Sequence, residues 1–242
     1  MSKRAKEQQK KRRKERARRN RLNVNRSQGS SRYCYVPTST NVVALEIHEE
    51  RAESHPPLSP EGIDKLSDAI ELSQKGKYKE AIKLLTEVNT KEPGRPSVIY
   101  NLAAFHLLHD RNAHEAFDAT IDMLVRDYPD YFFGKTAYAE RLIRHDQLEE
   151  AWEILQSLYQ RKRLHITEFK TLSSAAISYH LAAGQKEIAT ELHQSVVEIV
   201  GDSFPSMESF HTTFAANIFS RLAAMGGNRR RKKTATKKEP GM

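Results

Sequence analysis

The stretch KGKYKEAIKLLTEVNTKEPG, from Lys75 to Gly94, decides the fold because segments similar to it recur along the chain. It is an amphipathic run that begins beside a glycine and ends in Pro-Gly, which is typical of a helix with a defined start and a defined end. Similar segments lie at 110–124, 146–158 and 184–196. Each segment holds an alanine, and the spacings are 35, 35 and 38 residues: Ala81, Ala116, Ala151 and Ala189. The pattern indicates a repeated unit rather than one helix of an ordinary core.

A second helical segment precedes each of these runs, at 62–75, 96–109, 132–145 and 168–183. A small residue recurs in it as well: Ala69, Ala103, Ala139 and Ala176. Small side chains on both helices let the two backbones approach closely, and Gly76 and Gly184 suit the tight turn between them. One hairpin cannot bury its apolar face alone, so several must stack. We therefore predict an all-α, right-handed superhelical solenoid of about four hairpins, with no sheet in the repeats.

The repeated unit resembles the tetratricopeptide repeat (TPR), a helix–turn–helix of 34 residues with small residues at two fixed positions and a proline near its end. The first unit, 62–95, matches in register through Ala69, Gly76, Ala81 and Pro93. The other units match mainly by spacing, and the second and fourth need one extra residue at the turn. An unrelated helical bundle is the alternative, which four periodic units make the weaker one.

The resemblance implies that a protein or peptide partner binds along the concave face, which the first helices of the hairpins line. The corresponding positions are Ile63, Ser67, Ile70, Asn101, Ala104, Leu108, Phe133, Ala137, Glu140 and Arg144. One TPR subgroup grips a C-terminal carboxylate with Lys and Asn at set positions. Only Asn101 matches that set, so no such clamp is expected. The lining favours an amphipathic helix or an extended apolar peptide. We expect the aromatic run 128–133 to pack at a joint between repeats, rather than to serve as an anchor patch.

Charge divides the chain into three parts. Residues 1–32 hold 14 Lys/Arg and 2 Glu, and residues 226–242 hold 7 Lys/Arg and 1 Glu. Because the whole chain carries +9, the part between them, 33–225, carries −9. The basic ends lack the apolar residues that a core requires, so we expect a disordered arm at 1–32 and a disordered tail at 226–242.

Basic segments of this kind bind phosphate backbones by counterion release, so we expect attachment to RNA, a ribosome or another polyanion rather than to a specific DNA site. The cations concerned are Lys10, Lys11, Arg12, Arg13, Lys14, Arg16, Arg18, Arg19, Arg21, Arg229, Arg230, Arg231, Lys232 and Lys233. An inert solubilising tail or a nuclear-import signal is the alternative. A second hypothesis for the function is a nucleic-acid-associated protein in which the arms are the main element.

Two segments flank the predicted repeats. Residues 33–60 form a linker with a short apolar stretch, NVVALEI at 41–47, which suits a strand or a docked extended segment. We expect Val42–Ile47 to lie in the protein's own concave groove, because the short tether keeps it close. At the other end, 206–225 is expected to cap the last repeat, so the repeat domain spans 61–225. The apolar stripe of this cap is Phe210, Phe214, Ile218 and Leu222.

Residues that carry chemistry are scarce. There is no phosphate-binding glycine loop, nucleophile elbow or HExxH motif, so we expect no catalysis and no cofactor. His106, His109, Asp110 and His114 lie close together in the sequence, but a solvated helix end is favoured over a metal site. The single cysteine, Cys34, excludes an intramolecular disulfide and fits a reducing compartment. No apolar run reaches 18 residues, and the charged N-terminus does not resemble a secretory signal. We expect a cytoplasmic protein without a membrane span, or a nuclear one in a eukaryote.

Overall fold

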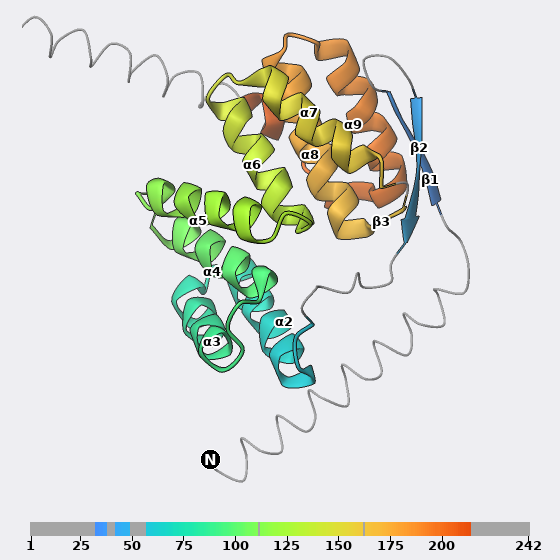
Figure 1. The fold of residues 1–242 in the computed structure, drawn as a ribbon. Coiled ribbons are helices and arrows are strands. Elements are labelled where there is room, and N and C mark those ends of the chain that lie inside the picture. Colours follow the sequence, from blue (N-terminus) through green and yellow to red (C-terminus); the bar gives the residue numbers. More distant parts are fainter. Residues whose placement is uncertain (1–31, 38–41, 49–56, 111, 162, 214–242) are drawn as a thin grey trace, which may run out of the picture.

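The structure is a computed structural model, and it describes residues 32–37, 42–48, 57–110, 112–161 and 163–213 (Figure 1). The basic arm up to residue 31 and the tail from residue 226 lie outside the described residues. Helices that follow one another pack in pairs, and successive pairs stack. The pairs are α2 (Pro60–Gln74) with α3 (Tyr78–Lys91), α4 (Pro96–His109) with α5 (His114–Asp127), α6 (Phe132–Arg144) with α7 (Leu148–Tyr159), and α8 (Ile166–Ala182) with α9 (Lys186–Val200). The predicted array of helical hairpins is confirmed.

Small residues lie where three of the four hairpins bring their helices together. Ala69 and Ala81 are fully buried in the first hairpin, as are their counterparts in the third and fourth: Ala139, Ala151, Ala176 and Ala189. The turn residues Gly76 and Gly184 have φ of 72° and 76°, which glycine adopts without steric cost. A tight turn between close-packed helices is therefore the rule of this array.

The second hairpin departs from that rule. Its turn, 110–113, has four residues, whereas the turns of the other hairpins have three, so the predicted extra residue is present here. The extra turn residue shifts the sequence of α5 by one position relative to the second helices of the other hairpins. Ala116 is consequently exposed, and Phe117 occupies the position that alanine holds elsewhere. The predicted alignment of Ala116 with Ala81 is wrong by one residue. The fourth hairpin keeps the three-residue turn, and its extra length lies in the longer helix α8.

A small sheet is attached to the last repeat; the sequence indicated a possible strand at 41–47 but not the strands that pair with it. Strands β1 (Arg32–Pro37) and β2 (Val42–His48) form an antiparallel hairpin, and β2 pairs in parallel with β3 (Arg163–His165), which lies between α7 and α8. Figure 1 shows the hairpin beside α9. Leu45, Ile47 and Leu164 are buried in one cluster with residues of α8 and α9.

The expectation that Val42–Ile47 lies in the concave groove is therefore wrong. In the sheet, backbone N–H and C=O groups of this segment form hydrogen bonds with β3. A position in the groove would leave these groups without such partners. The same finding corrects the prediction of repeats without a sheet, because β3 connects the third and fourth hairpins.

The chain beyond α9 packs back onto the last hairpin. A short 3-10 helix, η1 (Gly201–Ser203), is followed by helical residues 207–213. Phe204 is buried and Phe210 packs beside it, with 5.8 Å between the ring centroids, and both rings lie near His193 of α9. The beginning of the predicted capping helix thus covers α9. Its remaining stripe residues lie outside the described part: Phe214, Ile218 and Leu222. Among the described helices, none is both long and apolar enough to cross a membrane.

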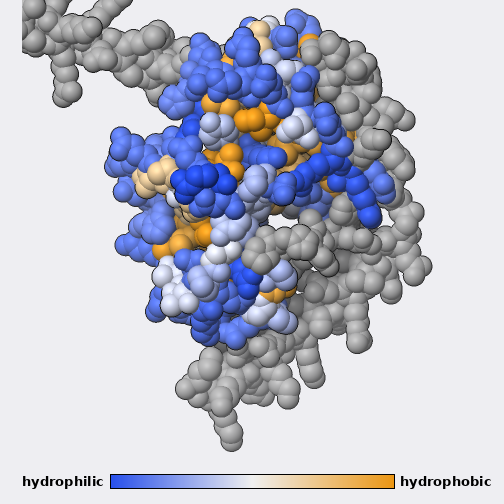
Figure 2. All heavy atoms as spheres, viewed as in Figure 1, coloured by the Kyte–Doolittle hydropathy of each residue, from blue (hydrophilic) through white to orange (hydrophobic). Residues whose placement is uncertain are grey.

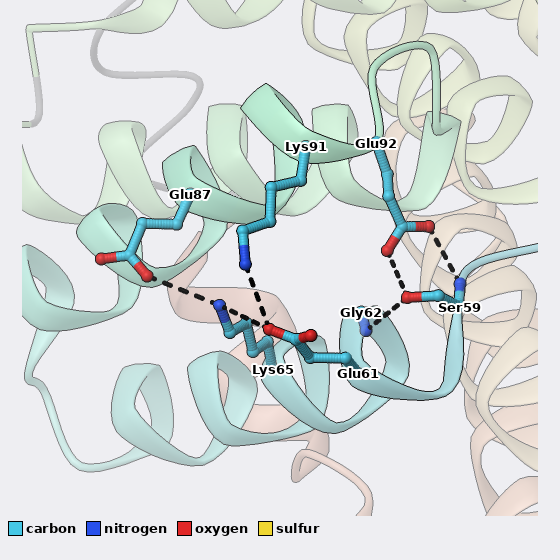
Figure 3. Close-up of polar contacts among 7 residues, drawn as sticks. All are labelled: Ser59, Glu61, Gly62, Lys65, Glu87, Lys91 and Glu92. Carbon is cyan, nitrogen blue, oxygen red and sulfur yellow. Dashed lines mark hydrogen bonds and ion pairs between the residues drawn. The ribbon is translucent and has the colours of Figure 1, made fainter.

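Polar contacts fix the start of α2 against the end of α3 (Figure 3). Ser59 caps α2, because its Oγ accepts a hydrogen bond from the Gly62 amide at 3.0 Å. The same hydroxyl donates to Glu92 Oε1 at 2.5 Å, and the Ser59 amide donates to Glu92 Oε2 at 2.9 Å. These bonds hold the pKa of Glu92 below its ordinary value. Lys91 and Lys65 also contact Glu61, at 3.3 and 3.2 Å.

Replacing Ser59 by alanine should destabilise the first hairpin. The variant loses the N-cap of α2 and one hydrogen bond to Glu92, and loss of an N-cap costs about 1 kcal/mol. Thr86→Ala is the matched control, because the Thr86 hydroxyl is exposed and bonds only the carbonyl of Ile82 in its own helix. Urea unfolding monitored by circular dichroism measures both. Equal stability of the two variants would contradict a capping role for Ser59.

Candidate functional site

Exposed apolar side chains gather on the first helices of repeats one and two. Ile63 and Ile70 of α2 are 38% and 36% exposed, and Leu108 of α4 is 53% exposed. They are the large hydrophobic residues classed as exposed in the described part of the chain, and all three belong to the set predicted to line the groove. Figure 2 shows hydrophobic residues reaching the surface over α4 and α2 among hydrophilic neighbours. We call Ile63, Ile70 and Leu108 the apolar face.

The other predicted residues of these two helices are half-buried. Ser67, Asn101 and Ala104 are partly covered. The Asn101 amide donates to the Ser97 carbonyl of its own helix at 2.7 Å. A side chain bonded in this way is not extended toward a ligand carboxylate.

The predicted residues of the third repeat are more enclosed. Ala137 is buried against Ile121 and Leu124 of α5, so its side chain does not line an open surface. Phe133 packs in an aromatic cluster, and Arg144 binds Asp118 of α5, with 3.1 Å between Nη2 and Oδ1. The open part of the predicted lining therefore belongs to repeats one and two.

An aromatic cluster fills the joint between repeats two and three. Tyr100 of α4 lies 6.4 Å from Phe117 of α5, 6.1 Å from Tyr131 and 6.1 Å from Phe133 of α6, measured between ring centroids. The prediction that the aromatic run packs at a joint is confirmed for Tyr131 and Phe133. Tyr100 is not among the predicted residues, although it lies one position before Asn101. An aromatic ring directly beside the predicted position Asn101 is the signal that could have identified it.

Glu140 lies beside this cluster and is half-buried. Burial raises the pKa of Glu140 to about 7, although the nearby Arg144 charge lowers it in part. Burial also raises the pKa of Tyr100, and the charge of Glu140 raises it further. A carboxyl group of this kind is partly protonated at neutral pH and then serves as a hydrogen-bond donor.

Replacing Glu140 by glutamine should stabilise the protein at high pH only. Because the pKa of Glu140 in the folded protein, about 7, lies above the ordinary 4.5, the folded state retains a proton that the unfolded chain releases. Stability therefore falls as the pH rises from about 4.5 to 7. At pH 8 we expect Glu140→Gln to raise the free energy of unfolding by about 1–2 kcal/mol, and near pH 4.5 by almost nothing.

Denaturant unfolding at the two pH values tests this, with Glu153→Gln on the exposed surface of α7 as the control. The control should change stability by less than about 0.5 kcal/mol at both pH values. A gain for Glu140→Gln that is the same at pH 4.5 and pH 8 would contradict the titration of a buried carboxyl.

The described residues offer little else for chemistry. They contain no group of three or more His, Cys, Asp or Glu side chains that could hold a metal ion. A cavity of about 240 Å³ among them is lined by Val125, Lys135, Tyr138, Glu153, Ile154 and Ser157. This lining combines one cation, one carboxylate, two hydroxyl groups and two aliphatic side chains, and the Ser157 hydroxyl donates to the Ile154 carbonyl of its own helix.

No protein-family model and no curated protein matches the sequence. Among solved structures, the MamA RS-1 ArsTM double mutant is similar over 68% of this chain and 98% of its own, at 13% identity and a TM-score of 0.38. A thermophilic TPR protein of Thermus thermophilus is similar over 65% of this chain and 99% of its own, at 17% identity and a TM-score of 0.36. The assignment of the fold rests on the chain's own stacked hairpins and buried alanines. The described helices form a TPR-like helical-repeat array.

Proposed function

We propose that this protein is a non-enzymatic scaffold that binds an amphipathic helix or an apolar peptide of a protein partner across α2 and α4. The apolar face is the observation that supports the proposal, because its three aliphatic side chains remain exposed on neighbouring helices. Ile63 and Ile70 are two helical turns apart, about 10 Å along α2. This spacing suits the i and i+7 anchors of a bound helix.

The charges around the apolar face indicate the polar flank of the partner. On α2, Asp64 and Glu71 are exposed, and Glu71 lies 3.8 Å from Lys75, whereas α4 has no Lys, Arg, Asp or Glu. A bound helix should therefore carry Lys or Arg on the side that faces α2, and apolar residues on the side that faces α4. This charge complementarity between the partner and α2 should raise the association rate and fix the register of the bound helix more than it raises the affinity.

We also propose that the basic arm and tail attach the scaffold to RNA, a ribosome or another polyanion. The support is the charge division, since the cations are concentrated in 1–32 and 226–242 while the residues between are acidic. The second candidate function follows from the same division: a nucleic-acid-associated protein in which the arms act without a protein ligand on the apolar face.

Peptide display on the full-length protein distinguishes these functions. Heparin in the binding buffer suppresses peptides that the basic arms retain by charge alone. We expect enriched peptides to carry Leu, Ile or Phe at helical spacing with flanking Lys or Arg. They should bind the Ile70→Ser/Leu108→Ser variant at least about tenfold more weakly, since central apolar anchors dominate such interfaces.

The matched control replaces two exposed lysines of α3, Lys79→Ser/Lys83→Ser, and should bind the peptides unchanged. Enriched peptides that bind both variants as well as the original chain would contradict a partner on the apolar face. Enrichment that requires the absence of heparin would favour the second candidate function.

A further inference from the structure

The carboxyl group of Glu140 has no bonding partner in the described part of the chain. Glu140 is half-buried on α6 and directly follows the buried Ala139, as Ile70 of the apolar face follows Ala69 in α2. No hydrogen bond or ion pair joins its carboxyl to another described residue. Polar groups that are shielded from water normally have a hydrogen-bond partner. A carboxyl without one, at a position of the predicted groove lining, indicates a group that a ligand supplies.

The arginines nearest to Glu140 on α6 are bound to α5 instead. Arg144, one turn after Glu140, contacts Asp118 with 3.1 Å between Nη2 and Oδ1. Arg141 contacts Asp122 with 2.7 Å between Nη2 and Oδ1. Among the described residues, Arg144 is the charged group that acts on Glu140, and it lowers the pKa of this carboxyl only in part. The protein's own cations therefore do not complete the site.

Two tyrosine hydroxyl groups at the same joint also have no hydrogen-bond partner in the described part of the chain. Tyr100 of α4 and Tyr131 lie 6.1 Å apart, measured between ring centroids, and neither hydroxyl bonds a described residue. The charge of Glu140 acts on Tyr100, whereas that of Glu168 of α8 acts on Tyr131. Glu168 itself accepts a hydrogen bond from the His165 amide at 3.0 Å. Glu140 is thus the acidic group at this joint that has no such bond.

Tyr100 connects this joint to the apolar face. Tyr100, Ala104 and Leu108 follow one another at intervals of four residues, so they lie along one stripe of α4. Leu108 is the exposed end of the stripe, and the ring of Tyr100 packs against Tyr131 and Phe133 at the other end. Eight residues of helix span about 12 Å. A helix that is anchored on Leu108 and follows this stripe therefore reaches the joint about two turns farther along.

We propose that Glu140 is a specificity-determining residue of the binding surface and receives a Lys or Arg side chain of the bound helix, about seven or eight residues from the apolar anchor on Leu108. The inference rests on the proposed binding of a helix across α2 and α4, and it identifies a residue that selects among such helices. A cation supplies the hydrogen-bond donor that the carboxyl lacks, and bonds between ionised groups are roughly twice as strong as neutral ones. The tyrosine ring faces attract a cation as well.

The same carboxyl disfavours helices without a cation at this position. An apolar side chain placed there would shield Glu140 further from water without offering it a hydrogen bond, which is unfavourable for a polar group. Specificity arises from such a mismatch as much as from the favourable contact. Helices with apolar anchors alone should therefore bind more weakly than helices that combine the anchors with one cation.

The pH dependence of binding distinguishes an ion pair from a purely structural role. Burial raises the pKa of Glu140 to about 7, and a bound cation lowers it again because it favours the charged form. A carboxyl with this pKa is about one-tenth ionised at pH 6 and about nine-tenths ionised at pH 8. Affinity for a cationic helix should therefore rise by up to about tenfold over this range.

Other groups near the surface do not obscure this signal. Tyr100 and Tyr131 stay protonated, because burial raises the pKa of both hydroxyls. The exposed His106 and His109 of α4 contribute equally in the original chain and in Glu140→Gln, so the comparison of these two proteins cancels their effect. Glu140→Gln is also expected to fold, because it removes a partly buried charge.

Selection from a displayed library of helical peptides, run in parallel on full-length proteins, tests the inference. The peptides have about 20 residues, nearly six turns, and contain no His or Cys. The targets are the original chain, Glu140→Gln, Ile70→Ser/Leu108→Ser and the matched control Glu115→Gln, which removes an exposed carboxyl from α5. On the original chain and the control we expect Lys or Arg about seven or eight residues from an apolar anchor. On Glu140→Gln the apolar anchors should remain and the cation preference should disappear.

The outcomes separate this inference from the proposed function. If Glu140→Gln selects the same cation at the same spacing, the role of Glu140 is wrong while the partner on the apolar face stands. If selection does not depend on Ile70 and Leu108, the proposed function fails and the inference fails with it. Enrichment of Ser, Asn or Gln in place of the cation would contradict the choice of a charged occupant.

Affinities of one selected peptide complete the test. Fluorescence anisotropy at pH 6 and pH 8 compares the peptide with a copy in which norleucine replaces the selected cation. The original chain should bind the cationic peptide up to about tenfold more tightly at pH 8, and Glu140→Gln should lose this gain. Glu140→Asp keeps the charge and should retain the preference for the cation over norleucine. The same change of affinity with pH in the original chain and in Glu140→Gln would overturn the inference.

Discussion

Replacing Leu45 by alanine should lower the free energy of unfolding by about 2–5 kcal/mol, although Leu45 lies outside the helical repeats. The side chain is fully buried in the cluster that contains Leu164, Phe169 and Leu172. Its backbone lies opposite Cys34 in the hairpin. Truncation removes three carbon atoms from a packed core and leaves a cavity that the surrounding helices only partly close. Urea unfolding of the full-length chain measures the loss.

Leu108→Ala is the control, because the same residue type is replaced at a site where the side chain is more than half exposed. This variant should change stability by less than about 0.5 kcal/mol. Similar stabilities for the two variants would mean that the hairpin does not pack on α8 and α9 in solution. The difference in stability between the two variants also distinguishes the exposed apolar face from the apolar strand segment around Leu45, which the protein buries in its own core.

The sequence could not reveal the destination of this hairpin. The run NVVALEI indicates that a short segment buries apolar side chains. Its hydrophobic pattern does not show which helix or strand the segment packs against. The receiving strand, β3, has three residues and no periodicity of its own, and it lies far along the chain. Pairing of this kind depends on long-range contacts rather than on local propensity.

The helices are different, because each hairpin is a local structure. Alanine spacing and turn glycines predict where the helices meet, and the structure buries Ala69, Ala139 and Ala176 as expected. Within the candidate site, Ile63, Ile70 and Leu108 are exposed, and their role in lining a groove stays a prediction.

The third repeat deviates from the predicted lining for a steric reason. Tyr100 and Phe117 hold bulky rings where α4, α5 and α6 meet, and one extra turn residue shifts α5 by a position. Ala137 consequently packs against α5 and is closed to a ligand. Side-chain volume at a joint between repeats is a tertiary property, which the spacing of one repeat does not encode.

Replacing Ala151 by leucine should destabilise the third hairpin by about 1–3 kcal/mol. Ala151 is fully buried between α7 and the neighbouring helices, in a cluster that also contains Ala139 and Leu155. Three added carbon atoms have no space there, so α6 and α7 must separate or the side chain must leave its preferred rotamer. For a chain of this length, each loss of about 1 kcal/mol lowers the melting temperature by about 2–4 °C.

Ala116→Leu is the sharpest control, because sequence alignment and structure predict opposite results for it. If Ala116 were equivalent to Ala151, as the 35-residue spacing indicates, leucine would overpack the second hairpin to a similar extent. The structure places Ala116 on the exposed surface of α5 and gives its position to Phe117. Leucine is also a good helix former, so Ala116→Leu should change stability by less than about 0.5 kcal/mol. A comparable loss in both variants would contradict the four-residue turn at 110–113, because only a regular turn would direct Ala116 toward α4.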